Sequence, residues 1–149
     1  MRHVLSVALG VLLVAGCMTA APTDTAAPLL VRGVVHDIAE HPIADATVSI
    51  TASGPVSSGT DEPGAVVFEA RVVGGPDGTF QFRAAPNDAL RAAANAGTGT
   101  VRFFLSARDA AGTSLGSWEF GRTLAADGWS GDAPAVVLRP VNSGPDGCC

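Results

Sequence analysis

Apolar and polar residues alternate along most of the chain after residue 28, which is the pattern of strands with one buried face and one wet face. The alternation is clearest in residues 47–51, 66–72 and 80–83. Gly, Pro, Asp and Asn separate these runs at the spacing of an all-β sandwich. We therefore expect a seven-stranded antiparallel β-sandwich with strands at residues 30–36, 46–52, 65–73, 79–83, 100–109, 114–122 and 135–139.

One short helix is expected between the fourth and fifth strands. Residues 88–96 are rich in Ala and other good helix formers. Asn87 precedes them as a preferred N-cap residue, and Gly97 follows as a residue that ends helices. Two tight turns are also indicated, at residues 76–78 and 109–112, because each ends in a Gly that accepts a positive φ.

Three aromatic side chains are candidates for contact with a partner. In the fifth strand the alternation turns Phe103 inward and leaves Phe104 on the outer face. Trp118 lies in the sixth strand, and Trp129 lies in a loop between Gly128 and Ser130. The Trp129 indole either folds back to plug the end of the core or offers an apolar face to a sugar or peptide. We favour the plug.

Composition and charge limit the classes of function that the chain can have. The chain has 149 residues, 47% of them hydrophobic and 15% charged, and a formal net charge of -5. This length allows one ordinary domain. An acidic balance argues against binding to nucleic acid, whose phosphates attract basic proteins.

The amino terminus has the features of a secretory signal. Arg2 precedes a charge-free apolar run at residues 4–16, which is shorter than the ~20 residues needed to span a bilayer. The run ends in Leu13-Val14-Ala15-Gly16-Cys17, and this motif resembles the lipobox of bacterial lipoproteins. The alternative is an ordinary signal peptide with a Cys beside its cleavage site.

The lipobox resemblance implies cleavage after Gly16 and a diacylglycerol thioether on Cys17. Acyl chains would then hold the domain at a cell membrane or outer membrane, facing the periplasm or the exterior. We expect a signal peptide at residues 1–16, a lipidated Cys and flexible tether at 17–28, the β-sandwich at 29–141 and a flexible tail at 142–149.

The first half of the predicted sandwich resembles the carboxypeptidase regulatory-like domain. Residues 31–37 give its apolar-x-Gly-x-apolar strand and Asp, residues 42–50 its Pro-Ile turn and alternating strand, and residues 77–82 its Asp-Gly-x-Phe turn. The resemblance implies a transthyretin-like sandwich, related to immunoglobulin-like folds, that serves in structure, interaction or carbohydrate contact. The chain departs from the pattern at Asp45, where the family has Gly, and in a long insert at residues 53–64.

Tests for catalytic chemistry are mostly negative. The chain lacks a Gly-x-Ser-x-Gly motif and any Gly-rich phosphate loop before a helix. Transthyretin-like hydroxyisourate hydrolases use a His three residues before the position of Asp37, where this chain has Val34, and a C-terminal Tyr, where this chain has no Tyr at all. His36, Asp37, Glu40 and His41 lack zinc-motif spacing, so solvated turn residues are favoured over a weak metal site. We expect no enzyme activity, cofactor or dedicated metal.

Cys148 and Cys149 end the chain as an adjacent pair. Adjacent Cys residues close only a strained ring, so an intermolecular disulfide is the better covalent alternative, and a soft-metal chelate is weaker still. The leading interpretation is that the Cys148 and Cys149 thiols have no function. The whole sequence therefore predicts a lipid-anchored, non-catalytic interaction or structural module that meets an unidentified envelope protein or glycan. The alternative is a carbohydrate- or peptide-binding sandwich with a ligand site on its loops.

Overall fold

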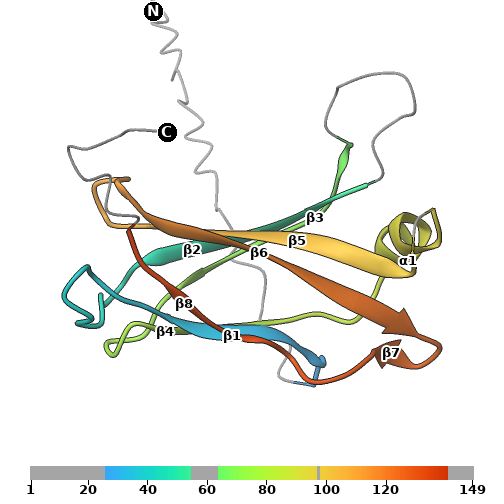
Figure 1. Cartoon of the computed structure of the whole chain (residues 1–149), viewed down its shortest axis with the longest axis horizontal. Helices are drawn as coiled ribbons and strands as arrows, with labels where there is room; N and C mark the ends of the chain where they lie inside the picture. Colours follow the sequence, from blue (N-terminus) through green and yellow to red (C-terminus); the bar gives the residue numbers. More distant parts are fainter. Residues whose placement is uncertain (1–25, 55–63, 97, 141–149) are drawn as a thin grey trace, which may run out of the picture.

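A computed structural model describes residues 26–54, 64–96 and 98–140, which fold mostly into strands arranged in two facing sheets (Figure 1). One sheet has the strand order β3-β2-β5-β6-β7, and the smaller has the order β4-β1-β8. The predicted all-β architecture of two packed sheets is confirmed. The elements are β1 (Leu29–Val35), β2 (Thr47–Ser53), β3 (Val66–Val73), β4 (Thr79–Arg83), α1 (Asp88–Asn95), β5 (Thr100–Arg108), β6 (Ser114–Ala125), β7 (Gly128–Trp129) and β8 (Ala135–Leu138).

Two details differ from the expected seven antiparallel strands. The described residues contain an eighth strand, β7, whose two residues pair with the end of β6. In addition, β8 runs parallel to β1, with Val136 beside Gly33 and Leu138 beside Val35. The parallel pair arises because the chain returns from the five-stranded sheet to the edge of the other sheet, and this return is a long-range event that alternation does not encode.

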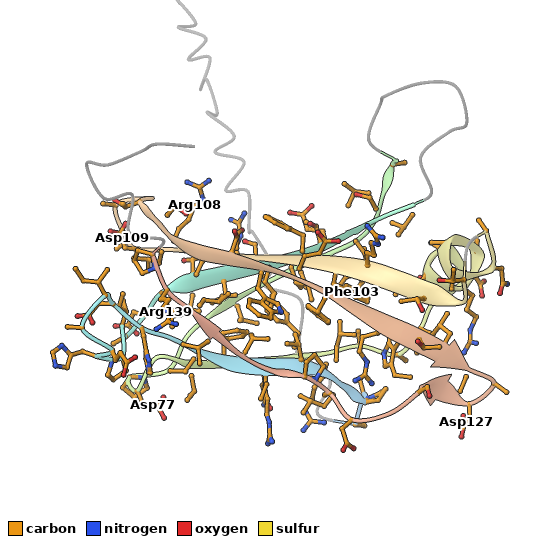
Figure 2. The ribbon with its side chains drawn as sticks, in the orientation of Figure 1. Asp77, Phe103, Arg108, Asp109, Asp127 and Arg139 are labelled. Atoms are coloured by element: carbon orange, nitrogen blue, oxygen red, sulfur yellow. The ribbon has the colours of Figure 1, made fainter. Side chains whose placement is uncertain are left out.

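The core lies between the two sheets and is filled by the inward rows of their strands. Phe103 on β5 is fully buried near its centre (Figure 2). Its ring stacks on Phe120 at 5.3 Å and meets Phe68 edge-on at 6.0 Å between ring centroids. Each buried large apolar side chain contributes roughly 1.5–3 kcal/mol. The aromatic cluster therefore joins β3, β5 and β6 into one packed unit.

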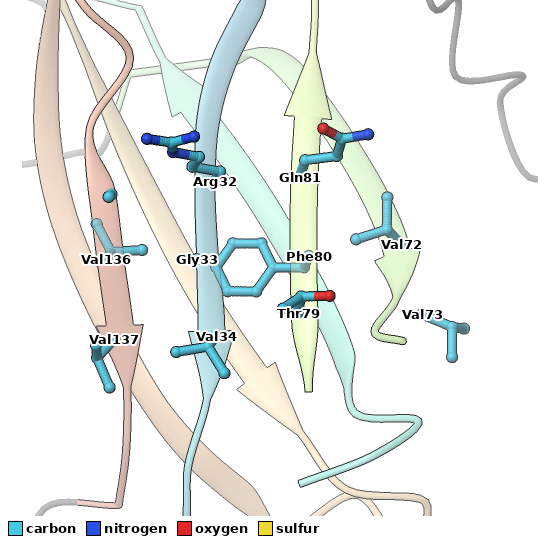
Figure 3. Close-up of a pocket in the computed structure, with 11 residues that line it drawn as sticks. Arg32, Gly33, Val34, Val72, Val73, Thr79, Phe80, Gln81, Val136 and Val137 are labelled. Atoms are coloured by element: carbon cyan, nitrogen blue, oxygen red, sulfur yellow. The ribbon is translucent and has the colours of Figure 1, made fainter. Parts of the chain in front are cut away.

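The small sheet depends on a close approach at Gly33. Phe80 of β4 is the registered neighbour of Gly33 on β1, and both face the core. A Cβ at Gly33 would lie 2.6 Å from Phe80 Cζ and 2.5 Å from the Val136 carbonyl oxygen. The Phe80 ring lies beside Gly33 between β1 and β4 (Figure 3). A larger residue at position 33 would push the ring out of the core.

The predicted helix and turns form through the expected local contacts. The Asn87 side chain accepts a hydrogen bond from Leu90 N at 2.9 Å, so it caps α1 as predicted. Gly78 and Gly112 both have positive φ, and each donates its N–H to the carbonyl three residues back. Asp45, which stands where the resembled family has Gly, has a φ of 55°. Its backbone is thus in the left-handed region that favours Gly.

Several expectations fall outside the described residues. These are the signal peptide at 1–16, lipidation of Cys17, most of the tether at 17–28, residues 55–63 of the insert, the helix stop at Gly97 and the tail with Cys148 and Cys149. The described part of the predicted 29–141 domain forms one hydrophobic core.

Candidate functional site

Phe104 lies on the outer face of the five-stranded sheet. Its neighbours in β5, Phe103 and Leu105, are buried, and the alternation turns Phe104 outward, where its side chain is 49% exposed. Thr51 of β2 and Glu119 of β6 are its registered cross-strand neighbours. Because opposite residues of paired strands share a face, the ring has a hydroxyl on one side and a carboxylate on the other.

A hollow of about 290 Å³ lies beside this ring. Besides Phe104, its lining includes Thr51, Ser53, Arg102 and Glu119. The Arg102 Nη1 and Glu119 Oε1 atoms are 3.6 Å apart, and both side chains are exposed. An exposed pair of this kind stabilises the fold by about 0–1 kcal/mol. Either side chain can therefore leave this ion pair at little cost and bind a ligand instead. We call Thr51, Arg102, Phe104 and Glu119 the Phe104 face.

Trp118 lies on the opposite face of the same sheet. It is the registered neighbour of the buried Leu105, so its side chain turns toward the small sheet. It is nevertheless 50% exposed. The small sheet has three strands against five, and β7 pairs with β6 only at Leu124 and Ala125. Trp118 therefore lies at an open edge of the large sheet, where the inner face is incompletely covered. Trp118 and Phe104 therefore do not form one exposed aromatic surface.

Trp129 has the plugging geometry. Its Nε1–H donates a hydrogen bond of 2.7 Å to the Ala84 carbonyl oxygen, which follows β4 in the other sheet. Its ring meets Phe103 edge-on at 5.6 Å between centroids. The side chain thus closes the end of the sandwich and bridges the two sheets. The structure therefore separates all three predicted contact aromatics, and only Phe104 stands on a polar outer face.

Arg122 is a structural residue that the sequence analysis did not single out. Its side chain is 4% exposed, and its Cζ lies 6.0 Å from the centroid of the Trp129 ring. Its Nη1 and Nη2 donate to the carbonyl oxygens of Asp132 and Gly131, so it holds the loop that follows β7. Burial lowers the pKa of this guanidinium, and nearby Asp132 opposes the shift. The buried Nε has no hydrogen-bond partner among the described atoms.

The cluster at residues 36–41 forms a turn. Asp37 Oδ1 accepts hydrogen bonds from Ala39 N at 2.8 Å and His41 N at 2.9 Å. The hydrogen bond from the His41 backbone is the main cause that lowers the pKa of Asp37. Glu40, at a positive φ of 65°, extends instead toward Arg139 at 3.4 Å. Within the described residues, no three His, Cys, Asp or Glu side chains are arranged to hold a metal ion.

A larger hollow, of about 840 Å³, borders the small sheet and the end of β3 (Figure 3). Its side-chain lining is mainly aliphatic and includes Val34, Val73 and Val137, with Arg32 as the charged group. The aromatic residue in its lining, Phe80, is buried in the core. This hollow therefore lacks an exposed aromatic ring beside an Arg and a Glu side chain, the combination that marks the Phe104 face.

Comparison with known proteins assigns no function to this chain, so any functional assignment rests on its own residues. No protein-family model, curated protein or solved structure matches the chain. In the three described stretches, none of the helical segments combines the length and hydropathy of a membrane span. The chemistry available at the Phe104 face is binding: an apolar ring surface, a hydroxyl, a carboxylate and a guanidinium at one exposed place.

Proposed function

We propose that the chain is a lipid-anchored, non-catalytic interaction module of the cell envelope, and that it contacts its partner through the Phe104 face. The observation that carries the contact surface is the half-exposed Phe104 ring beside a hollow with Thr51, Arg102 and Glu119. Aromatic and Arg side chains are enriched at protein interfaces because they offer large contact area and directed donors. The Glu119 carboxylate is exposed to water, whereas catalytic bases are usually buried so that their pKa lies near the working pH. This exposure supports a non-catalytic role.

Anchoring is supported by the amino-terminal motif. The apolar run that ends in Leu13-Val14-Ala15-Gly16-Cys17 is similar to a lipobox. Removal of residues 1–16 would leave eight Arg against 14 Asp and Glu, which is a side-chain charge of 8 − 14 = −6. Acidic side chains are not attracted to anionic lipid headgroups, so the acyl chains would hold the domain at the membrane without help.

The transthyretin-like type of the sandwich is part of the same proposal. Two motifs of the resembled family meet in space, since the Gly of its first strand, Gly33, lies under the Phe of its later turn, Phe80. The positive φ of Asp45 supports it further, because the family places Gly at that position. Modules of that family act in structure, interaction or carbohydrate contact.

Replacement of the lipobox cysteine tests the anchor. With Cys17→Ser, the chain is expected to leave the detergent phase, because no acyl chain remains to partition into detergent. The matched control is Cys148→Ser, which also removes one thiol but should leave partitioning unchanged. Retention of the Cys17→Ser chain in the detergent phase would refute lipid anchoring.

Site-specific photocrosslinking tests the contact surface. A photoreactive phenylalanine at position 104 should capture the partner in intact cells, because that side chain is half-exposed on the proposed contact face. The matched control is the same group at position 118, which is equally exposed on the opposite face of the sheet. Equal capture at both positions, or unchanged partner recovery after Phe104→Ala, would contradict the proposal.

A glycan is the second candidate partner, and the hollow beside Phe104 favours it. Its volume of about 290 Å³ is just below the range of small-molecule sites, which measure roughly 300–1,000 Å³. The Arg102 and Glu119 side chains can donate to and accept from neighbouring hydroxyl groups beside the apolar ring. Binding of envelope-derived oligosaccharides that is lost in both Phe104→Ala and Glu119→Ala would support the glycan. Retained binding would exclude this face.

A further inference from the structure

β3 is a long edge strand with a free side. Within the described part of the chain, β2 is the only strand that pairs with β3, so the other side of β3 presents backbone donors and acceptors without a strand partner. β3 has eight residues and no Pro, and its terminal residues Val66 and Val73 are 60% and 66% exposed. Such an edge is a template for another strand.

The other edges are less suitable. β7 has two residues, β8 has four and β4 has five. The end of β8 is also approached by β6, since a Cβ at Gly116 would lie 2.6 Å from the carbonyl oxygen of Arg139. β3 is therefore the longest of the four strands that end the two sheets. Within the residues that the structure describes, β6 also has residues without a strand partner on one side, since β7 pairs with it only at Leu124 and Ala125.

Two opposite charges mark the middle of β3. Glu69 and Arg71 are two residues apart and both face outward, opposite Thr51 and Ser49 of β2. Arg71 Nε donates to Ser49 Oγ at 3.2 Å, but neither charge forms an ion pair with another described residue. Ala70 lies between them and faces inward, opposite Ile50.

We propose that β3 pairs with β3 of a second copy of the chain in the antiparallel direction, with Ala70 opposite Ala70 of the partner subunit. In this register each Glu69 lies opposite Arg71 of the partner subunit, so the outer face gains two opposite-charge pairs. On the inner face Phe68 lies opposite Val72 of the partner subunit. Both are half-buried at the rim of the core and gain cover.

The charges select this register over its neighbours. A shift of one residue would place outward side chains opposite inward ones. A shift of two residues would place either Glu69 opposite Glu69 or Arg71 opposite Arg71, and directly opposite like charges are unfavourable. The sequence of β3 is thus self-complementary in one register, which makes a second copy of this chain its matching partner.

Charge reversal tests the interface in the full chain, kept in mild detergent with reductant so that the cysteines cannot form disulfides. Glu69→Arg and Arg71→Glu, each alone, make both cross-strand pairs repulsive and should raise the dimer dissociation constant about tenfold or more. The two variants mixed in equal amounts should form a heterodimer, and the Glu69→Arg, Arg71→Glu double variant should regain the homodimer. Arg102→Glu is the control, because it changes charge on the same sheet face away from the edge, and it should still dimerise.

Disulfide trapping tests the register in intact membranes. In a chain with Cys148 and Cys149 replaced by Ser, Ala70→Cys should give a reducible dimer, because opposite residues at a two-fold axis have Cα atoms about 4.5–5.5 Å apart. Ser106→Cys, at the centre of the sheet, is the control and should stay monomeric. A chain that sediments as a monomer, charge variants that dimerise like the unchanged chain, or equal trapping at both positions would overturn the proposal.

Discussion

Replacing Trp129 tests how the open end of the sandwich is closed. The indole contacts Phe103 in the core and donates to the Ala84 carbonyl oxygen of the other sheet. Removal of a core Trp costs about 3–5 kcal/mol. Trp129 is only half-buried, which favours the lower end, while the loss of its hydrogen bond adds about 1 kcal/mol. We therefore expect Trp129→Ala to lower the free energy of unfolding by about 3–4 kcal/mol, a large part of a typical 5–15 kcal/mol.

Urea unfolding followed by circular dichroism measures this loss, with two further variants as controls. Trp129→Phe keeps an aromatic ring and removes the N–H donor, so we expect a cost of about 1–2 kcal/mol. Trp118→Ala removes a half-exposed indole without a bridging hydrogen bond to the other sheet, and should cost about 1 kcal/mol or less. Equal costs for Trp118→Ala and Trp129→Ala, or an unchanged midpoint in Trp129→Ala, would refute the plug.

Two further substitutions probe the small sheet and its turn. Gly33→Ala should cost at least about 2 kcal/mol in the same urea assay, because its Cβ would lie 2.5 Å from the Val136 carbonyl oxygen. The pKa of Asp77 is lowered mainly by the hydrogen bond from the Thr79 hydroxyl. The ionised carboxylate therefore stabilises the fold at pH values above its unfolded pKa of 3.8. This stabilisation is lost as the pH falls through the lower pKa of the folded state. Melting temperatures between pH 2 and 5 should therefore depend less on pH in Asp77→Asn, and an unchanged slope would contradict the assignment.

Elements with strong local signals were predictable from the sequence. β4 has the predicted bounds of 79–83, because its alternation is bounded by a Gly turn and an Ala-Pro segment. α1 begins at Asp88 as predicted, because Asn87 provides the cap. The parallel position of β8 beside β1 and the short strand β7 were not predictable, since both depend on contacts between distant segments.

The candidate site was predictable in its parts but not in its assembly. Alternation correctly turned Phe104 outward, and the same alternation extended from Phe120 places Arg122 on the inward row, a signal that could have identified it as buried. The exposure of Trp118 follows from the unequal widths of the sheets, which no local pattern contains. The charge pair of Arg102 and Glu119 depends on the register between β5 and β6.

Pairing of two β3 strands would have a consequence for binding at the Phe104 face. Five strand spacings of about 4.8 Å separate the two β5 strands in the joined sheet, so the two Phe104 faces would lie roughly 24 Å apart on one continuous surface. A dimer that binds a multivalent surface through both Phe104 faces gains avidity without any new contact. In a Cys17→Ser background, which removes the lipid, Glu69→Arg should therefore weaken retention on isolated envelope fragments about tenfold or more, while Phe104→Ala should abolish it. A monomeric Glu69→Arg chain that is retained as well as the dimer would show that the two faces bind independently.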